Sequence, residues 1–263
     1  METSMLLTIT FIVGITAEAI TAALSAGRMR MDWFGVIALG SITALGGGTV
    51  RDILLNNHPL TWVGEPRYLI ITIVAALVTA QLSFLAAHFR RVFLTADAVG
   101  LAAFSVIGTQ IAFDLGHGVV IAAVAATVTG VFGGVLRDIL SDRVPLVFSQ
   151  EIYAAVSILT AVLYWGLDAA GVPVNWIIVI TLAFAFSSRM IAIKSHKNFP
   201  QYNYQGRETP VDPRLRLSAQ LIGKGVRKAK RKAKEGAEHL RPRHRRKSRD
   251  HTHDSDETPP DSQ

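Results

Sequence analysis

The chain has 263 residues, of which 50% are hydrophobic and none is cysteine. This composition favours a membrane protein over a soluble domain, and the lack of cysteine excludes disulfides, thiolate metal sites and cysteine nucleophiles. The net charge of +7 is unevenly spread, because residues 1–193 carry nine arginines, no lysine and eleven carboxylates (net −2) whereas residues 194–263 carry +9. This distribution excludes a uniformly basic nucleic-acid-binding globule.

Seven stretches of the chain are apolar over most of the roughly 20 residues that a bilayer-spanning helix needs. The first, Leu6–Leu24, has no basic segment before it and no cleavage site after it, so it predicts a retained helix and not a signal peptide. The six that follow are Trp33–Asn56, Tyr68–Phe89, Val92–Phe113, Val119–Leu140, Ile152–Leu167 and Val174–Ile193. The predicted fold class is all-α, a polytopic membrane protein with seven transmembrane helices.

Basic residues concentrate in alternate connections between these helices. The first, third and fifth connections carry Arg28 and Arg30, Arg90 and Arg91, and Arg143. The second connection carries Arg67 alone, and the fourth and sixth carry no Lys or Arg. The positive-inside rule therefore predicts a multi-pass protein of the plasma (inner) membrane, with its N-terminus outside and its basic tail in the cytoplasm.

The tail changes composition along its length. Leu215–Leu240 is rich in Lys, Arg and Ala, and Arg, His, Asp, Ser and Pro dominate after Arg241, so the tail is expected to be largely disordered. It is either a solvated tail or contains a helix that lies on anionic lipid. No aromatic residue interleaves its basic residues between Leu215 and Asp250, which disfavours nucleic acid as a partner.

Two segments of the chain repeat one pattern, Gly-Gly-x-x-Arg-Asp-Ile-Leu with a proline further on. Arg51 and Arg137 are 86 residues apart, and so are Asp52 and Asp138 and the prolines that follow them. A single Gly-Gly pair in an apolar helix would indicate only close packing. The repeated pattern at a matched spacing makes coincidence a poor explanation.

The two copies lie in the second and fifth predicted helices, so three helices separate one copy from the next. An odd number of crossings reverses direction in the membrane, which predicts a three-plus-three inverted repeat followed by a seventh helix, as is typical of transporters and channels. The chain then divides into a first repeat over 1–91, a second over 92–170, a seventh helix within 171–193 and the tail over 194–263.

The three consecutive glycines Gly46–Gly48 are expected to kink or unwind the second helix, because each glycine costs roughly 1 kcal/mol relative to alanine. A break at membrane depth is tolerated where it faces protein or a water-filled cavity, and it offers carbonyl groups to a cation and N–H groups to an anion. The second copy has Gly133 and Gly134 but Phe132 in the place of Gly46.

Arg51 and Arg137 would cost several kcal/mol if they faced lipid, so we expect both to face the interior and meet carboxylates. Adjacent residues on a helix point about 100° apart, so each Arg-Asp pair is expected to engage other helices. Glu18 is expected to face the path or to pair with an arginine. The residues predicted to line or gate a solute path are Gly46, Gly47, Gly48, Thr49, Arg51, Asp52, Gly133, Gly134, Arg137, Asp138 and Glu18. In the alternative interpretation the arginines cap helix ends or reach the interface, and the glycines only pack.

The order of Ala17–Ala19, Met31–Val36 and the two glycine-arginine-aspartate segments resembles bacterial members of the TRIC (trimeric intracellular cation channel) family, which are also described by a glycine-transporter domain that occurs twice per chain. The resemblance covers roughly Leu6 to Ile193. It implies seven transmembrane helices, a homotrimer, and one hydrophilic path per protomer around kinked second and fifth helices. By motif position, the first kink would hold the Arg51 copy and the second the Arg137 copy.

The predicted function is a channel or transporter for a small solute, with K⁺-like monovalent cations and glycine as candidates. Two buried arginines suit a zwitterion better than a cation unless carboxylates offset them. The alternative is a non-transporting membrane scaffold whose tail binds anionic lipid or an acidic partner. An enzyme is disfavoured, because the sequence has no recognisable nucleophile–base pair, dicarboxylate metal site or nucleotide loop, and neither a cofactor nor a metal is predicted.

Overall fold

The computed structural model describes residues 3–82, 89–149 and 152–195. The chain divides into two units, residues 1–201 and 202–263, and all the described residues lie in the first unit. The predictions made for the tail beyond Ser195 lie outside the described residues.

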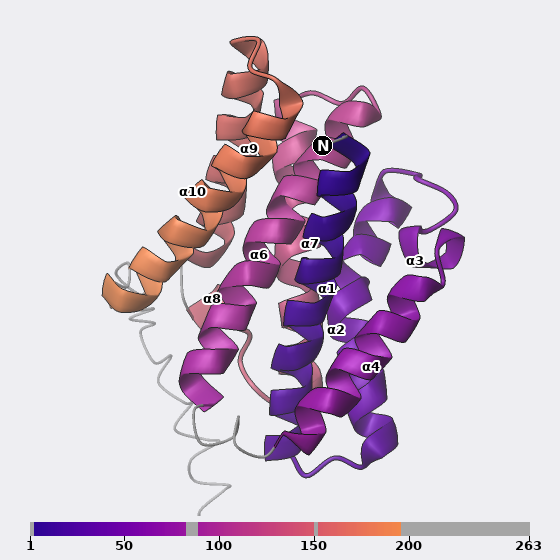
Figure 1. Ribbon diagram of the computed structural model, residues 1–263. Coiled ribbons are helices and arrows are strands. Elements are labelled where there is room, and N and C mark those ends of the chain that lie inside the picture. Colours follow the sequence, from indigo (N-terminus) through magenta and orange to yellow (C-terminus); the bar gives the residue numbers. More distant parts are fainter. Residues whose placement is uncertain (1–2, 83–88, 150–151, 196–263) are drawn as a thin grey trace, which may run out of the picture. The chain divides into compact units, whose positions relative to one another are not determined.

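Every regular element in the described part of the chain is a helix (Figure 1). The longer helices are α1 (Thr3–Arg28), α2 (Trp33–Leu54), α4 (Arg67–Gln81), α6 (Phe89–Asp114), α7 (Val119–Leu140), α9 (Ile152–Ala169) and α10 (Val174–Ser195). Two single-turn helices, α3 (Thr61–Gly64) and α8 (Leu146–Ser149), follow α2 and α7. The predicted all-α class is confirmed for these residues.

Five of the described helices are long and apolar enough to cross a membrane, namely α1, α2, α6, α7 and α10. The apolar helices α4 and α9 are shorter; α4 has 15 residues and spans about 22 Å at 1.5 Å per residue, against a hydrocarbon core of roughly 30 Å. The predicted span Tyr68–Phe89 is wrong at its end. Leu82 leaves the helical conformation (φ −83°, ψ 76°) and Phe89 begins α6, while hydropathy stays high across this boundary and so did not reveal it.

Local chemistry sets the ends of α2 and α7. Asp32 caps the start of α2, because its Oδ1 accepts a hydrogen bond of 2.7 Å from the Gly35 N–H. Asn56 and Asp142, which are 86 residues apart, end α2 and α7 with positive φ angles of 52° and 50°. The amides that follow donate to the carbonyls of Asp52 and Asp138 at 2.8 and 2.9 Å, as in a Schellman motif. The two copies of the repeat therefore end in the same way.

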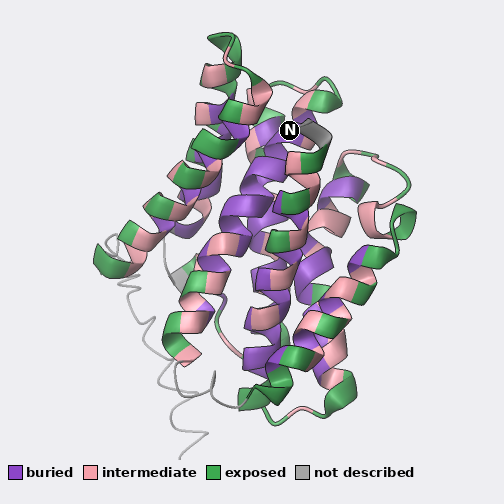
Figure 2. Ribbon diagram, viewed as in Figure 1, coloured by how far each residue is buried: buried purple, intermediate pink, exposed green. Residues whose placement is uncertain are grey.

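The helices pack in two groups of three. Helices α1, α2 and α4 contact one another, and so do α6, α7 and α9. The groups meet where α1 packs on α6 and α2 on α7, and buried residues follow these helices (Figure 2). Helix α10 packs on α6 and α9. The interior lies where the two groups meet, and it positions the candidate site.

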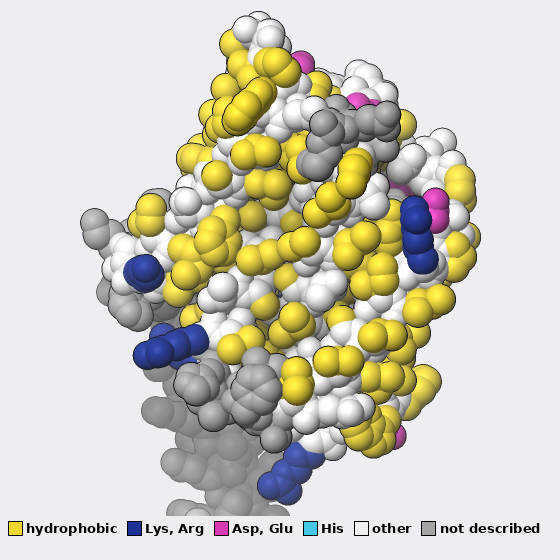
Figure 3. All heavy atoms as spheres, viewed as in Figure 1, with side chains coloured by type: hydrophobic (Ala, Val, Ile, Leu, Met, Phe, Trp, Pro, Cys, Tyr) yellow, Lys and Arg dark blue, Asp and Glu magenta, His cyan; other side chains and the backbone are white. Residues whose placement is uncertain are grey.

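Hydrophobic side chains are spread over the whole height of the face drawn in Figure 3, and few charged side chains lie among them. Large apolar side chains on α2, α7 and α10 are exposed, among them Phe34 (76%), Val120 (72%) and Trp176 (63%). An apolar exterior on this scale suits contact with lipid or with another membrane helix and not with water.

Candidate functional site

The two glycine segments lie where α2 crosses α7. Gly47 on α2 faces the carbonyl oxygen of Thr129 on α7, and Gly133 on α7 faces the carbonyl oxygen of Thr43 on α2. Gly47 and Gly133 are 86 residues apart, as are Thr43 and Thr129, and the order of the contacts makes the two helices antiparallel. A Cβ atom on either glycine would overlap the opposing carbonyl, so the close approach of the two backbones requires glycine.

Gly48 and Gly134 are also 86 residues apart, and they serve the arginines of their own helices. A Cβ atom added to Gly48 would lie 3.7 Å from Arg51 Nη2, and one added to Gly134 would lie 3.4 Å from Arg137 Nη2. Each guanidinium therefore folds back along its own helix to the level of the glycine, at ordinary contact distance.

The second helix was expected to kink or unwind at these glycines; the unwinding is wrong, and the kink stays a prediction. Helix α2 continues without a break through Gly46–Gly48, and α7 continues through Gly133 and Gly134. Gly46 packs on the neighbouring helix, because a Cβ atom there would lie 2.7 Å from Leu136 Cδ1. Close packing against the other helix offsets the low helix propensity of glycine. The packing role that the alternative interpretation gave the glycines is therefore confirmed for Gly47 and Gly133.

Thr49 connects α2 to the short helix α3. Its Oγ1 donates to the Leu45 carbonyl at 2.8 Å and accepts from Trp62 Nε1 at 3.0 Å. Its predicted place in a solute path stays a prediction.

Arg51 and Asp52 are both buried and bind each other. Arg51 donates to Asp52 Oδ1 from Nε at 2.9 Å and from Nη2 at 2.6 Å, and Nη2 also donates to Thr61 Oγ1 at 3.1 Å. Asp52 Oδ2 accepts from the Thr61 N–H at 2.9 Å and from its hydroxyl at 2.8 Å, and Asn57 Nδ2 donates to Oδ1 at 3.0 Å. The carboxylate thus fixes the turn after α2 and the start of α3.

The second copy repeats this arrangement. Arg137 Nε donates to Asp138 Oδ1 at 2.9 Å, and Asp138 Oδ2 accepts from the Leu146 N–H at the start of α8 at 3.0 Å. Each aspartate therefore engages a residue of another helix, as expected, because Asp52 binds Thr61 of α3 and Asp138 binds Leu146 of α8. Each also accepts from its neighbouring arginine, because a long arginine side chain can bend back to the adjacent carboxylate. Both arginines are fully buried, as predicted from the cost of exposing them to lipid.

Arg137 differs from Arg51 in reaching two other helices. Its Nη1 lies 3.1 Å from Asp97 Oδ1 on α6 and 3.5 Å from Glu18 Oε2 on α1, and it donates to Thr21 Oγ1 at 3.0 Å. Thr21 Oγ1 lies 3.1 Å from Glu18 Oε2. The predicted pairing of Glu18 with an arginine is confirmed, and Arg137 joins α1, α6 and α7 through charged hydrogen bonds.

Two further helices contribute to this cluster. Tyr153 on α9 donates its hydroxyl to Asp97 Oδ1 at 3.0 Å, and Arg189 on α10 places Nη2 at 3.7 Å from Asp97 Oδ2. The Arg189 guanidinium also lies over the Tyr153 ring, 4.2 Å from its centroid. We call Glu18, Thr21, Asp97, Arg137, Asp138, Tyr153 and Arg189 the Arg137 cluster.

Among the described residues, the buried acidic side chains outnumber the buried basic ones. The buried acidic and basic side chains are Glu18, Asp52, Asp97, Asp138, Arg51, Arg137 and Arg189. Four of them are acidic and three are basic. Every one lies in a salt bridge, which is the condition for tolerating charge in a membrane interior.

The residues predicted from the sequence to line a path did not include several members of these networks. Asp97 and Arg189 carried a signal, because each is an ionisable residue inside an apolar predicted span. Thr21, Thr61 and Tyr153 carried none, since hydroxyl residues are common in membrane helices and only the packing brings these to an arginine.

Comparison with known proteins assigns the chain to a family. The glycine transporter family model matches residues 8–83 and 94–169, one match for each half of the membrane region. The UPF0126 inner membrane protein YadS of Escherichia coli K12 is 36% identical over 193 residues, covering 73% of this chain and 93% of the relative. A UPF0126 membrane protein of Vibrio cholerae is 32% identical over 190 residues, covering 72% and 80%.

Solved structures of TRIC channels have the same fold. The TRIC trimeric intracellular cation channel orthologue from Rhodobacter sphaeroides has 35% identity and a TM-score of 0.69, over 72% of this chain and 98% of the other. A prokaryotic TRIC channel crystallised in 0.5 M KCl has 28% identity and a TM-score of 0.70, over 74% and 100%. With its apolar helices, the chain is a multi-pass membrane protein. The two family-model matches, the UPF0126 relatives and the shared fold together show that it belongs to the bacterial TRIC family.

Proposed function

We propose that the protein is a channel for monovalent cations such as K⁺, with a conduction path inside each protomer between α1, α2, α6 and α7. The observation that carries the proposal is the surplus of carboxylates among the buried ionisable side chains. Two buried arginines alone would favour a zwitterion, but four buried carboxylates outnumber the three arginines. Carboxylate oxygens attract and bind cations, and similar solved structures are described as cation channels.

Glu18 and Asp97 are the best candidates for cation ligands. Glu18 Oε1 and Asp97 Oδ2 are buried and accept no hydrogen bond from a described residue. Their other oxygens are held by Thr21, Tyr153 and Arg137, so these two oxygens are rigidly placed, and Asp97 Oδ2 also lies 3.7 Å from Arg189 Nη2. A partly dehydrated monovalent cation needs oxygen ligands of this kind.

The architecture that supports such a path is a three-plus-three inverted repeat with α10 as the seventh crossing. The first repeat would occupy 1–91, the second 92–170, the seventh helix 171–193 and the tail 194–263. The reciprocal contacts of Gly47 and Gly133 and the two groups of three packed helices support this division. Crossing the membrane with the 15 residues of α4 requires local thinning of the bilayer or a contribution from flanking residues.

The arginine distribution supports an N-terminus outside and a cytoplasmic tail in the inner membrane. The relatives described as trimeric channels support a homotrimer. Anionic lipid at the basic tail is the lipid partner that the sequence favours.

Glycine is the second candidate solute, because the matching family model is described as a glycine transporter. Arg51 Nη1 and Arg137 Nη2 have no hydrogen-bond partner among the described residues, so either could donate to the carboxylate of a zwitterion. A cation would bind the carboxylate oxygens of this interior, whereas the carboxylate of glycine would bind the arginine nitrogens.

The experiment compares K⁺ flux and radiolabelled glycine uptake in liposomes that contain the purified full chain. We expect K⁺ flux above that of empty vesicles, and a loss of most of it in Asp97→Asn, which keeps the shape of the side chain but removes its charge. The control is Glu65→Gln, because Glu65 is half-exposed and pairs only with the exposed Arg67 among the described residues. Its flux should equal that of the wild type.

Three outcomes would contradict the proposal. Glycine uptake without K⁺ flux would favour the second candidate. Equal flux in Asp97→Asn and wild type would show that the Asp97 carboxylate is not a cation ligand in the path. No flux of either solute would favour the non-transporting scaffold, in which deletion of 194–263 abolishes function while Arg51→Ala and Arg137→Ala leave it intact.

A further inference from the structure

The two halves of the membrane region differ at the positions that surround their arginines. Three partners of Arg137 are Glu18, Thr21 and Asp97. The residues 86 positions away from these three are Phe104, Ile107 and Phe11. All three replacements are apolar, and all three belong to one buried hydrophobic cluster.

The contacts show that this correspondence is spatial and not only numerical. Gly14 on α1 packs against Phe104 on α6, and a Cβ atom there would lie 2.9 Å from Phe104 Cε1. Gly100 on α6, 86 residues further on, packs in the same way against Glu18 on α1. The crossing of α1 and α6 therefore has an aromatic side and a charged side related by a local twofold axis.

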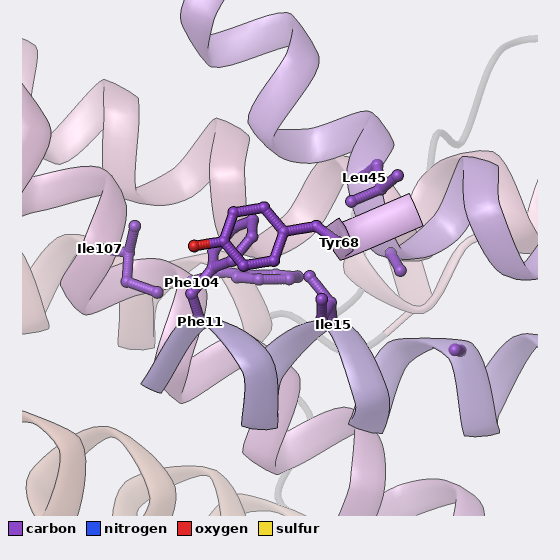
Figure 4. Close-up of a cluster of buried hydrophobic side chains, with 8 residues drawn as sticks. Phe11, Ile15, Leu45, Tyr68, Phe104 and Ile107 are labelled. Carbon is purple, nitrogen blue, oxygen red and sulfur yellow. The ribbon is translucent and has the colours of Figure 1, made fainter. Parts of the chain in front are cut away.

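Figure 4 shows the aromatic side, in which Phe11, Tyr68 and Phe104 meet between helices. The Phe11 and Tyr68 rings pack edge to face with centroids 4.6 Å apart, and the Phe11 and Phe104 centroids are 6.1 Å apart. The three side chains are 8%, 6% and 2% exposed, respectively. We call these three residues the aromatic cluster.

The aromatic cluster adjoins the surroundings of Arg51. Trp62 packs against the hydrophobic cluster that contains these rings, and it donates to Thr49 on α2, one turn before the end of that helix. Its neighbour Thr61 binds both Arg51 and Asp52. The aromatic cluster thus adjoins the surroundings of Arg51, whereas Glu18 and Asp97 pair with Arg137.

We propose that Phe11, Tyr68 and Phe104 form the apolar barrier of the cation path, at the end opposite to Glu18 and Asp97. This inference rests on the proposed function. An ion leaving the carboxylates toward Arg51 meets side chains that supply no oxygen ligand except the Tyr68 hydroxyl. Apolar constrictions of this kind exclude water and stop ions. The Phe11 and Phe104 rings therefore set the rate of conduction, and the carboxylates set its selectivity.

The experiment measures K⁺ flux in liposomes for the full chain and for variants of both phenylalanines. Phe104→Ala removes the ring, whereas Phe104→Gln and Phe11→Asn replace it by a smaller polar side chain that adds an oxygen ligand, so a folding defect in one variant leaves the others informative. We expect flux to rise about tenfold in each folded variant, which corresponds to about 1.4 kcal/mol of barrier. The matched control is Phe113→Ala, since Phe113 is a partly buried ring on the same helix that stacks on Tyr164 outside the aromatic cluster. Its flux should not change.

The outcomes separate this inference from the function on which it rests. Wild-type flux that Phe104→Ala, Phe104→Gln and Phe11→Asn leave unchanged or reduce would overturn the barrier and keep the channel. An equal rise in Phe113→Ala would also overturn it, because loosened packing would then suffice. Flux in the variants but not in the wild type would support a closed barrier. No K⁺ flux in any folded protein would overturn the channel itself.

Discussion

Gly133 on α7 lies directly against the backbone carbonyl of Thr43 on α2, and the pair Gly47 and Thr129 repeats the contact with the helices exchanged. Alanine at Gly133 should force the helices apart and lower the stability of the protein by about 1–3 kcal/mol, the usual cost of overpacking. Thermal unfolding of the detergent-solubilised protein measures the effect. Gly166→Ala is the control, because this exposed glycine in α9 has no atom near its missing side chain and alanine should stabilise it slightly. Equal stability of Gly133→Ala and wild type would show that the two helices can separate at little cost.

The two arginines of the repeat should differ in their effect on stability. Arg137→Ala leaves Glu18, Asp97 and Asp138 with one fewer positive charge, and loss of one partner of a buried ion pair typically costs about 3–5 kcal/mol. Arg51→Ala should cost less, because Asp52 keeps its hydrogen bonds from Thr61 and Asn57. Unfolding of both variants in increasing denaturant measures the difference.

The control for this comparison is Arg67→Ala, which removes an exposed pair with Glu65 and should cost no more than about 1 kcal/mol. A larger loss of stability in Arg51→Ala than in Arg137→Ala would show that the Arg137 cluster does not depend on its arginine more than the Arg51–Asp52 pair does.

Tyr153 and Tyr68 offer a matched test of the charged and aromatic sides. Tyr153→Phe removes the hydroxyl that donates to Asp97 and should lower stability by about 1 kcal/mol, the net value of a hydrogen bond. Tyr68→Phe keeps the edge-to-face contact with Phe11, and its hydroxyl forms no hydrogen bond with a described residue, so its stability should change less. The melting temperatures of the two variants measure the difference. A lower melting temperature for Tyr68→Phe than for Tyr153→Phe would show that the Tyr153–Asp97 hydrogen bond contributes nothing to stability.

Thr61 should matter more than an ordinary threonine in a membrane helix. Thr61→Val removes the hydroxyl that donates to Asp52 and accepts from Arg51, and the expected loss is about 1–3 kcal/mol, because two buried charged groups lose a partner. Thr127→Val is the comparison, since the Thr127 hydroxyl donates only to the Ala123 carbonyl of its own helix. If the unfolding curves of the two variants coincide, the hydrogen bonds of Thr61 to Arg51 and Asp52 do not stabilise the contact between α2 and α3.

Much of the interior could be predicted, because a charged side chain removed from water must pair with a group of opposite charge. An arginine inside an apolar segment must find carboxylates in the protein, so the burial and pairing of Arg51 and Arg137 followed from their position. The pairing of Glu18 with an arginine could be predicted for the same reason. The matched spacing of the two Arg-Asp pairs also predicted that residues 86 apart have matching surroundings, and the contacts of Gly47 and Gly133 agree.

Other features depend on tertiary contacts that no local pattern contains. Helix propensity predicted a break at Gly46–Gly48, but the gain from packing against α7 outweighs that propensity. The end of α4 near Gln81 was missed, because hydropathy does not change there. The different surroundings of the two arginines lie in α1 and α6, so the repeat itself predicted a symmetry that Phe11 and Phe104 break.

Arg189 has a consequence for how the protein is made. It lies on the last described helix, and its partner Asp97 lies about 90 residues earlier, on α6. During synthesis, Glu18, Asp97 and Asp138 enter the membrane before Arg189, and until then Arg137 is the only arginine of the cluster. Helix α10, which carries Arg189, is the last of the described helices to be made. The interior therefore reaches its final charge balance only when α10 docks, so insertion of that helix completes the assembly of the charged core and not merely its outer covering.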